Sequence, residues 1–190
     1  GDVIGLTNPG LFVVGDTVSS GPNLQFAPIP PFQPEQFGRL VNLHVDKYKQ
    51  FNKGLAQLAE EGVIQVLYPQ ESVRREPILA AVGQLQFDVV VARLAAEYQV
   101  EARFEPLEYT CARWVRSDDA GLATAQWPAQ SLRALDSRGH TVVLFPSEWT
   151  MNYCIEKNPR LVLQTVDDLV VQTEAPWFVA TQAQAKERGR

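Results

Sequence analysis

The chain has 190 residues, of which 45% are hydrophobic. This is enough apolar material to bury a core in one large domain or two small ones, so global disorder is excluded. Lys and Arg number 17 against 22 Asp and Glu, which gives a formal charge of -5. A uniformly basic coat for nucleic acid is therefore excluded, and any contact with RNA must be local.

The chain contains two cysteines, Cys111 and Cys154, and two histidines, His44 and His140. These are too few for a disulfide framework, and their spacing forms no zinc-binding cluster. No uncharged apolar run approaches the ~20 residues that a membrane span needs, so we expect a cytoplasmic protein without membrane contact. The first residues lack an initiating Met and have the pattern of a strand interior, which suggests a fragment of a longer protein.

The N-terminal region is expected to hold the end of one domain and then a linker. Two short apolar runs, 3–6 and 11–14, flank an Asn-Pro-Gly turn. We interpret residues 1–21 as remnant strands of a β-barrel domain. Five prolines then make residues 22–34 a stiff linker, and its apolar side chains predict that it lies against a surface.

Residues 35–106 have the element order β-α-β-β-α-β of a ferredoxin-like split βαβ unit. Apolar periodicity predicts these elements in order: a strand at 41–45, a helix between Asp46 and Gly62, strands at 63–68 and 77–82, a helix at 84–98 and a strand at 100–104. Asp46 is the expected N-cap of the first helix, and Gly62 should follow its end. Five side chains of the second helix are expected to face the core: Leu85, Val89, Val90, Leu94 and Tyr98.

Residues 107–170 are expected to form a second, smaller α/β unit. The predicted elements are strands at 107–115, 141–145 and 161–166, a helix at 148–157 capped by Ser147, and one or two short helices within 118–138. Residues 171–190 are expected to be a C-terminal tail. The predicted fold class is therefore α+β, with a ferredoxin-like unit followed by a second α/β unit and preceded by the barrel strands.

No catalytic, cofactor-binding or metal-binding residues can be assigned from the sequence. A glycine-rich phosphate loop is absent, His44 and His140 have the setting of ordinary histidines, and the cysteines have that of core fillers. An RNA-recognition motif shares the element order, but it stacks bases on aromatic residues of its third strand, and 77–82 contains none. We therefore expect that this chain is not an enzyme.

The one candidate interaction site is a set of basic residues: Lys47, Lys49, Lys53, Arg74 and Arg75. The three lysines lie in the first turns of a predicted helix, where positive charge opposes the helix dipole at a cost of ~0.3 kcal/mol or more each. A phosphate-bearing partner would offset this cost. The sequence leaves a solvated helix face open as the alternative.

Three segments, 37–40, 53–66 and 81–94, carry a specific resemblance. The Gly-x-Leu-Gln-Phe-Asp-Val-Val run at 83–90 is the most specific, and Arg113-Trp114-Val115 adds to it. The chain resembles the C-terminal domain of bacterial peptide chain release factor 3, a family of translational GTPases. Residues 1–21 are similar to the closing strands of the β-barrel that follows the GTPase domain in these factors.

The resemblance implies a role in translation termination and protein biosynthesis. The full-length factor would bind the ribosome and promote recycling of the codon-reading release factors, with GTP and magnesium in a GTPase domain that lies before Gly1. This chain would be a non-catalytic arm without a cofactor. Its expected partners are the ribosome (rRNA and ribosomal protein), its own GTPase and barrel domains, and, indirectly, the codon-reading release factors. The alternative is a stand-alone ferredoxin-like module that binds a ligand or regulates another protein.

Overall fold

A computed structural model describes residues 2–7, 11, 14–20, 26, 32–70, 76–116, 119–166 and 168. The first half of the described elements comprises β1 (Gln36–Asn42), η1 (Val45–Lys47), α1 (Tyr48–Glu60), β2 (Gln65–Pro69), β3 (Ile78–Ala81), α2 (Gln84–Tyr98) and β4 (Ala102–Pro106). The second half contains β5 (Cys111–Arg116), α3 (Asp119–Thr124), β6 (Leu132–Leu135), β7 (Thr141–Phe145), α4 (Glu148–Lys157) and β8 (Val162–Gln164). The α+β class predicted from the sequence is confirmed.

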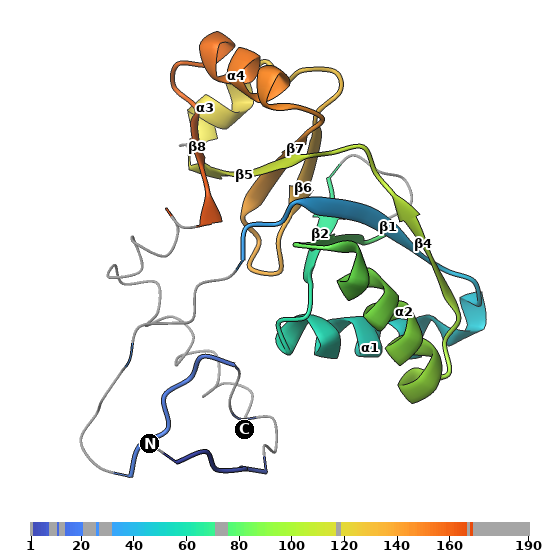
Figure 1. Ribbon diagram of the computed structural model, residues 1–190. Coiled ribbons are helices and arrows are strands. Elements are labelled where there is room, and N and C mark those ends of the chain that lie inside the picture. The colour runs from blue at the N-terminus through green and yellow to red at the C-terminus, as the bar shows by residue number, and fades with distance from the viewer. Residues whose placement is uncertain are drawn as a thin grey trace.

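The described strands form one eight-stranded sheet in the order β4-β1-β3-β2-β6-β7-β5-β8 (Figure 1). Each neighbouring pair is antiparallel. The first half has the predicted β-α-β-β-α-β order. The predicted boundary at residue 106 thus separates two segments that share a sheet.

A strand that the sequence did not reveal joins the two halves. We expected one or two short helices within residues 118–138, but the segment contains the helix α3 followed by the strand β6. β6 pairs with β7 along its whole length and with β2 at its end, where Tyr68 lies opposite Leu135. The strand has only four residues, so no long alternation marks it in the sequence.

Three further expectations in the first half are wrong. The first strand ends at Asn42 rather than residue 45, because the Asn42 side chain accepts a hydrogen bond from the backbone N–H of His44 and turns the chain. Asp46 lies inside the 3-10 helix and does not cap α1, whose N-cap residue is Lys47 without a side-chain cap bond. Leu85 and Val89 are 76% and 41% exposed, because Phe87, Val90 and Leu94 occupy the inner side of α2.

The strand expected at 3–6 is also absent, and its apolar side chains are largely exposed. No described strand lies beside it to provide backbone hydrogen bonds, and isolated short strands are unstable in water. Part of the run at 11–14 lies outside the described residues. Arg74, Arg75 and the tail from 171 to 190 lie wholly outside them.

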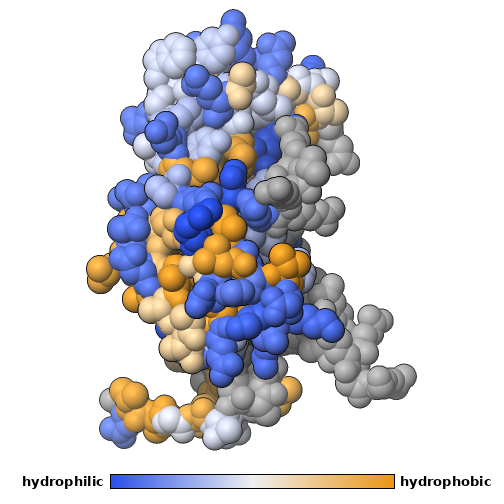
Figure 2. Space-filling model, turned by 90° about the vertical axis from the view of Figure 1, so that its right-hand side faces the viewer, coloured by the Kyte–Doolittle hydropathy of each residue, from blue (hydrophilic) through white to orange (hydrophobic). Residues whose placement is uncertain are grey.

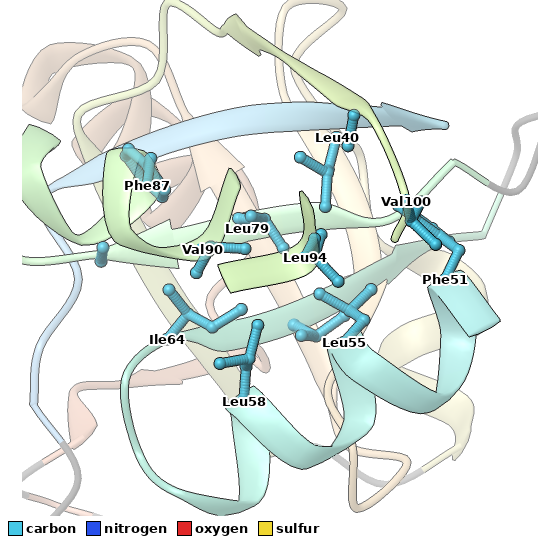
Figure 3. Close-up of a cluster of buried hydrophobic side chains, with 13 residues drawn as sticks. Leu40, Phe51, Leu55, Leu58, Ile64, Leu79, Phe87, Val90, Leu94 and Val100 are labelled. Atoms are coloured by element: carbon cyan, nitrogen blue, oxygen red, sulfur yellow. The ribbon is translucent and has the colours of Figure 1, made fainter. Parts of the chain in front are cut away.

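The helices α1 and α2 cover one face of the first-half strands, and a large hydrophobic core lies between the helices and the sheet (Figure 3). Leu40 and Leu79 point from the sheet toward Leu55 of α1 and Leu94 of α2. Gly54 allows the helices to approach closely, since a Cβ there would lie 2.7 Å from Leu94 and 2.8 Å from Tyr98. The two helices therefore form a closely packed pair.

The opposite face of the same strands is buried against the second half. In β3, Leu79 and Ala81 face the helix-covered core, while Ile78 and Ala80 belong to a cluster with Trp114 and other second-half residues. Strands buried on both faces are apolar without alternation, which explains the sequence Ile-Leu-Ala-Ala. The two halves consequently share a core as well as a sheet.

Candidate functional site

The three lysines among the predicted basic residues lie near one end of the sheet. β1 and β2 both pair antiparallel with β3, so they run parallel to each other and end on the same side. α1 begins at that end, after η1. The chain also leaves the described structure there after Gln70 and returns at Glu76. Lys47, Lys49 and Lys53 are thus placed, whereas Arg74 and Arg75 lie outside the described residues.

Lys47 has a structural partner. Its Nζ donates a 2.7 Å hydrogen bond to the backbone carbonyl of Gln99, the residue that ends α2 in a left-handed conformation. A cation at a helix C-terminus interacts favourably with the helix dipole and satisfies a free carbonyl. Lys47 therefore fastens the start of α1 to the end of α2.

Lys49 and Lys53 are exposed on the outer side of α1. Neither makes an ion pair or a side-chain hydrogen bond with any residue that the structure describes. Like charges four residues apart on a helix repel by ~0.2–0.5 kcal/mol. Tyr48, which is 63% exposed, lies beside them at the start of the helix. The pair is therefore available to an anionic partner.

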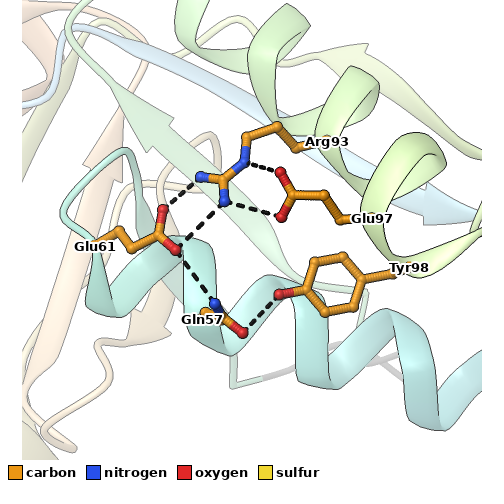
Figure 4. Close-up of polar contacts among 5 residues, drawn as sticks. All are labelled: Gln57, Glu61, Arg93, Glu97 and Tyr98. Atoms are coloured by element: carbon orange, nitrogen blue, oxygen red, sulfur yellow. Dashed lines mark hydrogen bonds and ion pairs between the residues drawn. The ribbon is translucent and has the colours of Figure 1, made fainter. Parts of the chain in front are cut away.

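A polar network holds α1 against α2 (Figure 4). The guanidinium of Arg93 donates to Glu97 at 2.6 and 2.9 Å, and it also donates to Glu61 at the end of α1. Hydrogen bonds from Arg93 lower the pKa of both carboxyl groups. Tyr98 donates to Gln57 at 2.7 Å across the same interface. This network fixes the orientation of the helix that carries Lys49 and Lys53.

The two histidines pair with carboxylates of the fold, and the two cysteines are buried in it. His44 pairs with Glu101 at 3.1 Å, and His140 pairs with Asp136, which also accepts a hydrogen bond from the Trp114 indole. Cys111 and Cys154 are buried, as expected for core fillers, and burial raises the pKa of Cys154. Within the described ranges no three His, Cys, Asp or Glu side chains form a metal-binding group.

An open cleft of about 310 Å³ lies where β2 meets β6. Its walls come from β2, β6 and the loop before β6: Pro69, Trp127, Pro128, Ala129, Ser131, Leu132 and Arg133. The polar groups in it are already engaged within the protein. Ser131 donates to the carbonyl of Pro128 at 2.7 Å, and the guanidinium of Arg133 lies 5.6 Å from the centre of the Trp127 ring.

Comparison with known proteins decides the family. Residues 26–155 match the family model described as class II release factor RF3, C-terminal domain. The chain belongs to the release factor 3 family. This agrees with the resemblance carried by residues 83–90, which form the N-terminal half of α2 and the turn before it.

Curated relatives named peptide chain release factor 3 match nearly the whole chain. The protein from Gloeobacter violaceus is 48% identical over 170 residues, covering 89% of this chain and 32% of the relative. Those from Acaryochloris marina and a Cyanothece species are 44% and 46% identical, each covering 90% of this chain and 32% and 31% of the relative. The chain thus spans about a third of the length of these release factors.

Sequence reasoning missed an aromatic surface of this family member. Trp149 and Tyr153 lie one turn apart on α4, with ring centres 5.7 Å apart and nearly parallel, and Trp149 is 73% exposed. The ammonium of Lys157 lies 5.5 Å from the centre of the Tyr153 ring. The spacing of four residues within a correctly predicted helix was the available signal.

In the described structure no helix is both long and apolar enough to cross a membrane.

Proposed function

We propose that this chain is the non-catalytic C-terminal part of a translation termination factor, which docks on the ribosome and positions a GTPase domain that promotes recycling of codon-reading release factors. The observation that carries this proposal is the family match over residues 26–155. The relatives' name places those proteins in peptide chain release. GTP and magnesium would be bound by the preceding domain, and the factor would act in the cytoplasm.

The ribosome contact that we assign to this chain includes Lys49 and Lys53. Both ammonium groups are exposed on one side of α1, and the packed core and the Arg93 network hold that helix in place. Two fixed cations on an otherwise acidic chain suit a local contact with rRNA phosphates. Arg74 and Arg75 remain candidates from the sequence. Lys47 is a weaker candidate, because its ammonium is already bonded to Gln99.

The test compares the full-length factor with a form lacking residues 35–190. Ribosome-stimulated GTP hydrolysis should fall strongly in the shortened form, since its GTPase domain is no longer held in position. GTP hydrolysis without ribosomes serves as the control for the nucleotide site and should be retained. Equal ribosome stimulation of the two forms would contradict the proposal.

The alternative, a ligand-binding or regulatory module, is favoured by one observation, the cleft between β2 and β6. Its polar groups, Ser131 and Arg133, already interact with the loop that lines it, which leaves few groups to orient a ligand. Small-molecule binding that raises the melting temperature of the chain and is abolished by Trp127→Ala would support this second function.

A further inference from the structure

Two exposed tyrosines lie at the end of the sheet where α1 begins. Tyr48, the first residue of α1, is 63% exposed, and Tyr68, near the end of β2, is 43% exposed. Neither hydroxyl group has a hydrogen-bond partner among the described residues. Tyr98 on α2, by contrast, donates to Gln57 across the helix interface. The hydroxyl of Tyr98 thus contributes to the fold, whereas those of Tyr48 and Tyr68 remain open to a partner.

The alternation of side chains along β2 determines where Tyr68 points. Val66 belongs to the core beneath α1 and α2, whereas Leu67 belongs to the cluster on the opposite face of the sheet. Tyr68 follows Val66 by two residues, so its side chain leaves the sheet on the face that the helices cover. The ring therefore lies on the side of α1, outside the core that the two halves share.

Tyr48 faces this place from the helix. Gly54, Gln57 and Glu61 contact α2 and mark the side of α1 that faces that helix. With 3.6 residues per turn, Tyr48 lies about 150° around the helix from the middle of that side. Since α2 packs on β3 and β4, and β2 follows β3 in the sheet on the other side, Tyr48 is turned toward β2.

The two tyrosines also lie at the same end of their elements. α1 has 13 residues, about 20 Å, and β2, which returns beside it after a short turn, has five residues, about 17 Å. The end of β2 is therefore level with the start of α1. Burial, and then the electrostatic effect of nearby Tyr48, raise the pKa of Tyr68. We call Tyr48 and Tyr68 together the tyrosine platform.

Unpaired positive charge adjoins the tyrosine platform. Lys49 follows Tyr48 directly and Lys53 lies one turn later, both exposed and without a partner among the described side chains. α1 contains no acidic residue before Glu60, so nothing on this part of the helix offsets the two charges. Figure 2 faces the side of the molecule on which Figure 1 shows the start of α1, and hydrophilic and hydrophobic side chains lie close together there.

Aromatic rings beside lysines suit one kind of RNA. Proteins bind unpaired nucleotides by stacking bases on aromatic side chains while cations contact the phosphates. In an A-form duplex the bases are stacked on one another, and lysines alone suffice for the backbone. The sheet face that an RNA-recognition motif uses for stacking is buried here, with Ile78 and Ala80 in the core. The tyrosine platform therefore offers the described rings a different place for the same chemistry.

We propose that the tyrosine platform is a stacking site for unpaired rRNA bases, with Lys49 and Lys53 at the adjoining phosphates. The inference rests on the proposed function, because it specifies the RNA that the ribosome contact of this chain takes. That RNA is a loop, bulge or other unpaired segment, and a duplex does not fit. Charge complementarity selects RNA, and the two open rings select its bases as well as its backbone.

The test compares ribosome binding by the full-length factor and three variants. Tyr48→Leu with Tyr68→Leu removes both rings and keeps apolar side chains, whereas Tyr48→Phe with Tyr68→Phe keeps the rings and removes the hydroxyl groups. Tyr153→Leu on α4 is the matched control, because Tyr153 is 42% exposed, close to the value for Tyr68. The melting temperature of the 190-residue chain carrying each change checks that the fold is retained.

The expected results separate stacking from charge. The double leucine variant should bind ribosomes at least about fivefold more weakly, because each stacked base loses its ring. Its slope of log affinity against log salt should equal that of the native factor, since stacking releases no counterions. The double phenylalanine variant and Tyr153→Leu should both bind like the native factor.

Acylation of rRNA 2′-hydroxyl groups identifies the RNA. Unpaired, flexible nucleotides react quickly, and those held on a protein surface react slowly. At saturating native factor we expect a few unpaired nucleotides to lose reactivity, and at saturating double leucine variant they should regain it. Tyr153→Leu should leave the native pattern unchanged.

Three results would overturn the proposal. Native affinity in the double leucine variant would show that the rings make no contact. Equal losses in the leucine and phenylalanine variants would assign the contact to the hydroxyl groups. Weaker binding without a change in the acylation of unpaired nucleotides would assign the tyrosine platform to a ribosomal protein.

Failure of this inference is distinguishable from failure of the proposed function. If the double leucine variant binds like the native factor while Lys49→Ala with Lys53→Ala weakens binding, stacking alone is rejected. If ribosome stimulation is the same with and without residues 35–190, the proposed function itself is wrong.

Discussion

The Nζ of Lys47 lies 2.7 Å from the carbonyl oxygen of Gln99, a residue 52 positions further along the chain. The contact joins the turn before α1 to the end of α2 on the same side of the sheet. Gln99 has a positive φ of 55°, so the helix ends there and its last carbonyls need partners. A residue that the sequence suggests for RNA binding thus has a role in the fold.

Lys47→Met is expected to lower the free energy of unfolding by about 0.5–1.5 kcal/mol, because it removes one charge-assisted hydrogen bond at a partly exposed site. Lys49→Met on the outer side of α1 should change it by less than about 0.5 kcal/mol. Urea denaturation of the two variants measures the difference. An equal effect of both substitutions would show that the bond to Gln99 contributes nothing.

Replacing Lys49 and Lys53 together by alanine should weaken ribosome binding and reduce its salt dependence. Each lost phosphate contact lowers the slope of log affinity against log salt by about 1. Gln50→Ala with Asn52→Ala removes two neutral side chains from the same helix and is the matched control. Binding titrations at several salt concentrations give the slope. If the lysine variant keeps the wild-type slope, the two residues belong to a solvated face.

The Arg93 network predicts an acid-dependent loss of stability. Hydrogen bonds from Arg93 lower the pKa of Glu61 and Glu97 below the ordinary value of 4.5, so the unfolded chain takes up these protons first. The stabilisation is complete above that value and is lost as pH falls through the lowered pKa values.

Arg93→Met should flatten the decline in unfolding free energy below pH 4.5. Arg93→Lys should have an intermediate effect, since lysine keeps the charge but not the paired N–H groups. Denaturation curves collected between neutral and acid pH provide the measurement. A Met variant with the same acid profile as the native chain would exclude a contribution of Arg93.

What the sequence predicts best is what local contacts determine. The bounds of α4 follow from Ser147, whose hydroxyl accepts a hydrogen bond from the N–H of Thr150 three residues later. The start of α2 is fixed in a similar way by Gln86, whose side chain accepts a hydrogen bond from the N–H of Gly83, although we predicted this helix from its apolar periodicity. Contacts of this kind lie within one turn of helix, so they depend on neighbouring residues alone.

The errors have different causes. β6 is missed because it has only four residues, which form no helical or strand pattern of their own, although its main partner β7 follows it directly in the chain. Leu85 is apolar and has a core-like spacing, yet it lies on the outer side of α2. The partner of Lys47, Gln99, is remote in sequence. For the candidate site, the sequence identified the exposed pair Lys49 and Lys53 but could not separate it from Lys47.

Gly54 is expected to tolerate no side chain, although alanine is normally favoured over glycine within a helix by about 1 kcal/mol. A Cβ at this position would lie 2.7 to 2.9 Å from atoms of Leu94 and the Tyr98 ring. Gly54→Ala should therefore lower the free energy of unfolding by about 1–3 kcal/mol, because α1 and α2 must move apart. Gln50→Ala, at an exposed site of α1, is the control for helix propensity. A more stable Gly54→Ala variant would show that the helices relax freely.

The side chain of Asn158, at the end of α4, makes two hydrogen bonds to Gln126 in the loop before β6 and one to the backbone of its own helix. Its Nδ2 donates to the carbonyls of Cys154 at 2.8 Å and Gln126 at 2.9 Å, and its Oδ1 accepts from the N–H of Gln126 at 2.7 Å. The residue is only 7% exposed, so water cannot easily replace the amide. Asn158→Ala should lower the free energy of unfolding by about 1–3 kcal/mol, since it leaves backbone groups unpaired. Asn152→Ala, exposed on the same helix, should have little effect, and equal destabilisation by the two variants in thermal denaturation would rule out this role.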